Sequence, residues 1–126
     1  MKKDIIKQLR QHTETLLERY KLEHVEVSDE DPAEFKGSFV DRRVFYPVIN
    51  DDLKYLIALH EIGHFAIVCR RGVVLDELSV WIWCREVALI WPLEFDQLVA
   101  GCIESYCENI NKSDRVNEIT KVVMRS

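Results

Sequence analysis

Residues 59–66 read LHEIGHFA and place two of the chain's four histidines, His60 and His64, four residues apart, with Glu61 directly after the first. Residues i and i+4 of an α-helix project from the same face, so a helix here would aim both imidazoles at one point. Given the chain's content of His and Glu, chance would produce this H-E-x-x-H pattern in about 1% of such sequences. The pattern therefore predicts a helix that binds a metal ion.

The residues around the motif have the features of a helix. Asn50 or Asp51 can act as its N-cap, basic residues fall in its last turn, and Gly72 can end it, which predicts a helix over residues 52–71. The same helical face carries several apolar side chains, so we expect the imidazoles to point into the interior. These apolar residues are Leu53, Leu56, Ile57, Ile67 and Val68. The alternative is a pair of core histidines satisfied by hydrogen bonds alone.

The rest of the chain predicts an α+β fold. An amphipathic helix is expected over residues 3–20, a strand in residues 24–29, and one bent strand or a hairpin in residues 38–49. After the motif we expect a helix from Asp76 that breaks at Pro92, then helices over residues 93–110 and 114–125. The expected structure is a small β-sheet with the motif helix and several further packed helices, in a single domain over residues 1–126.

Charge and composition exclude several functions. A net charge of −5 and a pI near 5.4, without clustered Lys and Arg, argue against a nucleic-acid partner. At the N-terminus, Asp4, Lys7 and Arg10 interrupt any apolar run, so we expect neither a signal peptide nor a membrane span. These features predict a cytoplasmic protein.

The cysteines favour a reducing compartment. None of the four forms a C-x-x-C pair, and we interpret them as reduced, buried thiols, with a structural zinc site as the weaker alternative. They are Cys69, Cys84, Cys102 and Cys107.

A catalytic zinc ion usually has three protein ligands, so the motif needs one more donor, and the choice lies mainly between Glu77 and Glu86. Apolar neighbours make an unpaired charge costly at Glu86, and a motif helix that continues about seven residues past His64 places Glu86 at the right level on a returning helix. Glu77 has another role available, because an acidic side chain in a first turn favours the helix dipole. Other carboxylates, His12 and His24 remain open. The expected ligands are His60, His64 and Glu86.

The segments YLIALHEIGH and REVALIWPLEF resemble the small H-E-x-x-H metallopeptidases of phages and mobile elements, which are similar to the ImmA/IrrE-type, gluzincin-like group. The resemblance spans roughly residues 43–107. In that group a helix after the motif carries an acidic ligand in an E-x-A pattern with aromatic residues nearby, which corresponds here to Glu86, Ala88 and Trp91. Leu89 and Pro92 depart from the pattern. The resemblance implies a minimal zincin-like fold.

The motif and its zinc ion predict peptide-bond hydrolysis with a peptide or protein as substrate. Glu61 would act as the general base that takes a proton from water and passes it to the leaving amine. The strand near residues 42–49 is a plausible edge for pairing with an extended peptide. Tyr46, Tyr106 and Arg85 are unranked candidates for stabilising the oxyanion.

The competing hypothesis is a zinc-stabilised protein-interaction or regulatory module without catalysis. Three tryptophans, Trp81, Trp83 and Trp91, could form an exposed recognition patch, although aromatic residues at this density in a helix are more often core. Glu61 favours the enzyme, because a binding module needs no base beside a metal-bound water.

Overall fold

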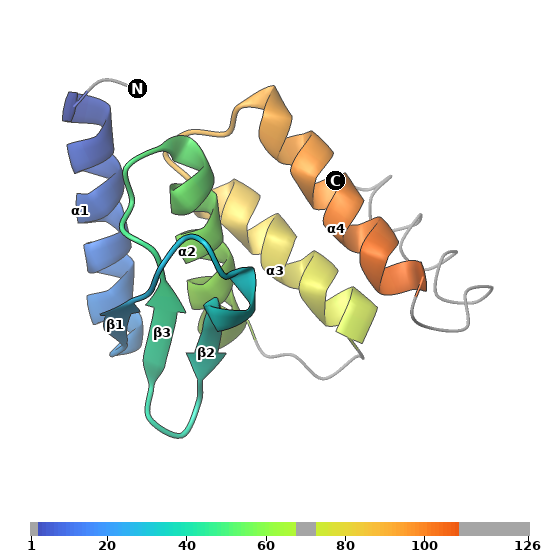
Figure 1. Ribbon diagram of the computed structural model, residues 1–126, viewed down its shortest axis with the longest axis horizontal. Helices are drawn as coiled ribbons and strands as arrows, with labels where there is room; N and C mark the ends of the chain where they lie inside the picture. Colours follow the sequence, from blue (N-terminus) through green and yellow to red (C-terminus); the bar gives the residue numbers. More distant parts are fainter. Residues whose placement is uncertain (1–2, 68–72, 109–126) are drawn as a thin grey trace. The chain divides into compact units, whose positions relative to one another are not determined.

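The computed structural model describes residues 3–67 and 73–108, with only the backbone for residues 73–75 and 106–108; the helix expected at residues 114–125 lies outside this part of the chain. The chain divides into two compact units, Met1–Ala66 and Ile67–Ser126. The first combines helices with a sheet, and the described part of the second is helical (Figure 1). The predicted α+β class is confirmed, while the single domain over residues 1–126 stays a prediction.

Helix α1 (Lys3–Tyr20) has the boundaries that its periodicity predicts. Its buried residues recur at helical spacing: Leu9, Thr13, Leu16 and Leu17. The residue after the helix, Lys21, has a φ of 55°, and the Leu22 N–H donates to the Leu17 carbonyl at 2.8 Å. A left-handed residue together with this hydrogen bond over five residues is a Schellman cap, which turns the chain sharply toward the first strand.

The sheet has three strands in the order β1-β3-β2. Strand β3 (Arg43–Tyr46) lies in the centre, parallel to β1 (Glu23–Glu26) and antiparallel to β2 (Lys36–Ser38), and a short 3-10 helix, η1 (Pro32–Glu34), precedes β2. The prediction of an edge strand near residues 42–49 is therefore wrong. Val44 and Tyr46 are buried, and the backbone N–H and C=O groups of a buried strand need hydrogen-bond partners, which β1 and β2 supply on its two sides.

The turn between β2 and β3, residues 39–42, is tied to two helices by Arg42. This residue has a φ of 53°, and its guanidinium donates to the carbonyls of Tyr20 and Lys21 at the end of α1. The same group lies 5.6 Å from the ring centroid of Phe65. Arg42 thus compensates the negative end of the α1 dipole and contacts the last turn of the motif helix.

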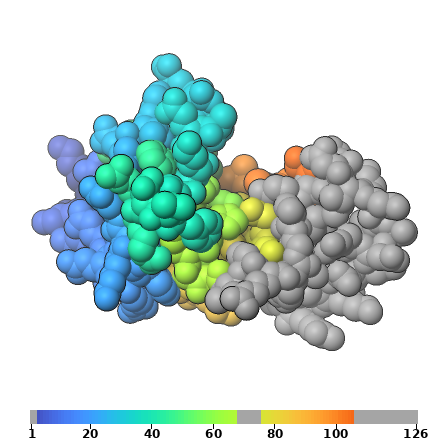
Figure 2. Space-filling view, turned by 90° about the horizontal axis from the view of Figure 1, so that it is seen from below, coloured from blue at the N-terminus to red at the C-terminus, as the bar shows by residue number. Residues whose placement is uncertain are grey.

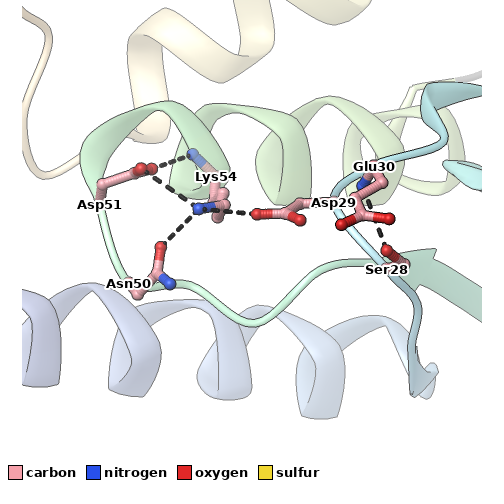
Figure 3. A network of polar contacts seen from close by, with 6 residues as sticks. All are labelled: Ser28, Asp29, Glu30, Asn50, Asp51 and Lys54. Carbon is pink, nitrogen blue, oxygen red and sulfur yellow. Dashed lines mark hydrogen bonds and ion pairs between the residues drawn. The ribbon is translucent and has the colours of Figure 1, made fainter.

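Helix α2 (Asp52–Ala66) carries the motif, and Asp51 is its N-cap: its carboxylate accepts from the Lys54 N–H at 2.8 Å. The Lys54 ammonium donates to Asn50 at 2.7 Å and pairs with Asp29 at 3.2 Å, which links the loop after β1 to the start of α2 (Figure 3). Burial of Tyr55, Leu59 and other side chains packs α2 against α1, β2 and β3.

The predicted end of this helix at residue 71 is wrong. Helix α2 stops at Ala66, Ile67 lies in a bend, and residues 68–72 fall outside the described part of the chain. Ile67 and Val68 are β-branched and lose side-chain freedom in a helix, which favours an earlier end than Gly72 suggested.

The second unit contains α3 (Val73–Val87) packed against α4 (Leu93–Glu108). Helix α3 ends at Val87, five residues before Pro92 and earlier than predicted. Trp91 instead donates its indole N–H to Asp96 at 2.9 Å in the first turn of α4. The predicted helix from residue 93 is confirmed as far as Glu108.

A hydrogen bond of 2.6 Å between His12 Nδ1 and the Tyr55 hydroxyl joins α1 to α2. Tyr55 is fully buried and His12 half-buried. Burial, and then the charge of Arg19, lower the pKa of His12 below its ordinary value of 6.5. The neutral imidazole is therefore the form that the fold favours.

Because the pKa of His12 is lowered in the fold, we expect the free energy of unfolding to fall on mild acidification. The unfolded chain binds the His12 proton more tightly than the folded chain. The stability that neutral His12 contributes is therefore complete above about pH 6.5 and is lost as the pH falls through the folded-state pKa. Urea unfolding at several pH values should show a smaller loss in His12→Gln than in the wild type. Equal losses in the two proteins would contradict this prediction.

Candidate metal centre

The H-E-x-x-H motif lies on the last two turns of α2, as predicted. His60 is 9% exposed, and Glu61 and His64 are half-buried. The expectation that the imidazoles point into the interior is confirmed for His60, while His64 is half-buried and Leu53 on the same face is 44% exposed. The two imidazoles therefore lie at the border of the buried face.

The distance between the two imidazoles fits a shared metal ion. His60 Nε2 and His64 Nε2 are 3.3 Å apart, with ring centroids at 4.8 Å and ring planes at 86°. Two nitrogens bound to one tetrahedral zinc ion at about 2.0–2.1 Å are themselves about 3.3 Å apart. A hydrogen bond between two neutral imidazoles has a similar length, so the spacing fits both a shared metal ion and a pair of core histidines that are bonded to each other. The pair could hold a metal ion.

The motif turn is held against the edge strand β2 by Phe65, the residue after His64. A Cβ built on Gly37 of β2 would lie 2.5 Å from Phe65 Cε2, so only glycine allows this close approach. The Phe39 ring lies 4.5 Å from the Phe65 ring, centroid to centroid, and the Arg42 guanidinium covers it as well. Sequence reasoning missed this packing; the available signal was an apolar Phe39-Val40 pair inside a polar turn.

Both arguments that favoured Glu86 as the third ligand rest on premises that are wrong. Glu86 is exposed and lines a groove of about 890 Å³ between α3 and α4, with Arg85 and Glu104 among its neighbours, so it does not need a metal to offset burial. The motif helix ends two residues after His64, not seven. Neither fact decides the ligand, and the assignment of Glu86 stays a prediction.

Glu77 lies on the opposite side of α3 from Glu86, because nine residues turn a helix by about two and a half turns. Glu77 is half-buried and shares its side with the buried Val80 and Cys84. After burial itself, the Glu77 carboxylate is the second cause that raises the pKa of the Cys102 thiol on α4. Glu77 thus lies on the buried side of α3, whereas Glu86 lies on the exposed side.

The remaining candidates have structural roles. His12 is bonded to Tyr55, and His24 stacks on Tyr46 with ring centroids 3.6 Å apart. Tyr46, a candidate for the oxyanion, is buried, and burial raises the pKa of its hydroxyl despite a hydrogen bond to Thr13.

Two further oxyanion candidates belong to the second unit. The Arg85 guanidinium lies 4.0 Å from the Asp96 carboxylate. The side chain of Tyr106 lies outside the described residues. As expected, Cys84 is a buried thiol, while Cys102 is half-buried and also outside any disulfide.

Comparison with known protein families, curated proteins and solved structures gives no match to this chain. Among the described helices, none is both long and apolar enough to cross a membrane. Functional inference therefore rests on the chemistry of the residues themselves.

Replacing Gly37 by alanine tests the packing that positions the motif turn. The new methyl group would collide with the Phe65 ring, which Phe39 and Arg42 hinder from moving away, so Gly37→Ala should lower the free energy of unfolding by about 1–3 kcal/mol. Gly101→Ala is the matched control, because nothing lies within 4 Å of the added methyl and a helical alanine should stabilise by up to about 1 kcal/mol. Urea unfolding that ranks the two variants equally would contradict this account.

Proposed function

We propose that this chain is a zinc-dependent peptidase of a minimal zincin-like fold, with His60 and His64 as ligands of the ion. The observation that carries the proposal is the 3.3 Å separation of the two Nε2 atoms, the spacing that one tetrahedral ion requires, with Glu61 directly beside the pair. The resemblance of residues 43–107 to the ImmA/IrrE-type metallopeptidases supports the same reading.

We further propose Glu77 as the third ligand in preference to Glu86. Two imidazoles and one carboxylate form a donor set of hydrolytic zinc sites, and Glu77 would supply the carboxylate of this set. A half-buried carboxylate gains more from a cation than an exposed one, because it has lost part of its hydration. The resemblance to the peptidase group favours Glu86 instead, because the acidic ligand of that group corresponds to Glu86.

A zinc ion bound here would lower the pKa of a coordinated water to about 7 and polarise the scissile carbonyl. Glu61 is turned about 100° around the helix from His60, so its carboxylate lies beside the metal-binding face without being a ligand. The Glu61 carboxylate accepts one proton from the attacking water and delivers it to the nitrogen of the leaving amine. The amide C–N bond breaks, the hydroxyl joins the acyl carbon, and the proton completes the amine.

The competing interaction module loses part of its support. Trp81 and Trp83 are buried in the core of their unit, as the density of aromatic residues predicted, so they do not form an exposed patch. Trp91 is half-buried and bonded to Asp96. Retention of Glu61 beside the two histidines remains the feature that favours an enzyme.

The ligand assignment is tested by zinc titration of the purified protein, with competition by a chelator of known affinity. Wild type should bind one zinc ion, and His60→Ala or His64→Ala should abolish stoichiometric binding. Glu77→Gln should weaken binding more than about 100-fold, beyond the 10–100-fold cost of losing an outer-shell partner. The matched Glu86→Gln should leave affinity within a few-fold of wild type. The reverse order would return the third ligand to Glu86, and no zinc uptake by wild type would end the proposal.

The catalytic assignment is tested by Glu61→Gln, which keeps side-chain size and helix propensity but removes the base. This variant should bind zinc as wild type does and lose about 10²–10⁴-fold in the rate of peptide hydrolysis. Mass spectrometry of a zinc-loaded incubation with unfolded protein detects the products. If neither protein cleaves and both bind a partner equally, the interaction module is the correct function.

A further inference from the structure

The turn between β2 and β3 exposes two consecutive apolar residues. Phe39 is 62% exposed and Val40 96% exposed, in a position where turns usually carry Gly, Asn, Asp, Ser or Pro. Val40 buries almost nothing, so its contribution to the fold does not explain its presence. Figure 2 shows this part of the chain, in teal, at the surface of the first unit.

This apolar tip is continuous with the candidate metal centre. The Phe39 ring contacts the Phe65 ring at 4.5 Å. Phe65 follows His64 and is four residues after Glu61, so on α2 it lies in the same stripe as the proposed base. Two aromatic rings therefore border the side of the metal-binding pair on which the proton acceptor lies.

The edge strand beside these rings suits an extended chain. Strand β2 pairs only with β3 among the described strands, so it is an edge strand of this sheet, the kind of strand with which an extended peptide pairs through its main chain. Gly37 of β2 and Phe39 of the turn both lie against the Phe65 ring, so this end of β2 faces α2.

The cations near the turn are engaged within the unit. Arg42 binds the carbonyls at the end of α1, Arg43 pairs with Glu23 at 3.4 Å, and the Lys36 ammonium lies 5.4 Å from the Phe45 ring centroid. This engagement favours an apolar peptide over an anionic membrane surface as the occupant of the tip.

We propose that Phe39, Val40 and Phe65 determine specificity by contacting an apolar side chain of the substrate next to the cleaved bond. The inference rests on the proposed peptidase function and names the class of substrate: an extended, unfolded or flexible protein segment with an exposed apolar residue.

The experiment uses the zinc-loaded full chain and a peptide library whose central positions vary over all residue types, with products read by mass spectrometry. Wild type should cleave beside apolar residues, and Phe39→Ser and Val40→Ser should each reduce the preference for apolar over polar residues about 10-fold or more. Leu93→Ser, an exposed apolar residue on α4, is the matched control and should keep the wild-type preference. Cleavage with an unchanged preference in both turn variants would overturn the inference while the peptidase stands.

Peptide binding to the Glu61→Gln protein separates recognition from chemistry. Apolar peptides could bind this protein and lose that binding in Phe39→Ser, while wild type cleaves none of them. This outcome would support the recognition surface and contradict the peptidase function. Absence of such binding in a zinc-loaded, folded protein overturns the surface. Phe39-dependent binding to phosphatidylserine-containing vesicles in place of peptides would assign the tip to a membrane and equally overturn it.

Discussion

The contact of the Phe65 ring with the bare Cα of Gly37 is the constraint on which the geometry of the first unit depends. A helix and an edge strand can approach this closely only where one of them lacks a side chain. Arg42 adds a second restraint, because one guanidinium covers the ring and also binds the end of α1. The last turn of α2 is thus fixed to two other elements at the point where the motif lies.

Helix α2 is held at both ends. Asp51 and the Lys54 network anchor its first turn, while Phe65 anchors its last. Side chains on a helix restrained in this way keep their relative positions, so less conformational entropy would be lost if an ion were bound. The separation of the His60 and His64 nitrogens is therefore a property of the scaffold as well as of the motif.

Local patterns predicted the start of α2 and both ends of α1, although they placed the ends of α2 and α3 too late. Predictions that depended on distant packing failed for the place of β3 and for the surroundings of Glu86. The period of Leu9 and Leu16 predicted α1, and an Asp before an apolar period predicted the cap at Asp51, because each signal acts within a few residues. The central place of β3 depends on β1 and β2, which no short pattern encodes. The exposure of Glu86 depends on α4, and its apolar neighbours in sequence were a poor guide to its surroundings.

The strand order has a consequence for synthesis of the chain. Strand β3 is made last but lies between β1 and β2, so neither earlier strand has its partner until residue 46 has left the ribosome. Helix α1 can form early, yet its apolar stripe has no sheet or α2 to cover it until then. During this interval the nascent chain exposes two unpaired strands and an amphipathic helix, which are features that holding chaperones bind. Pairing of all three strands becomes possible only when β3 is complete.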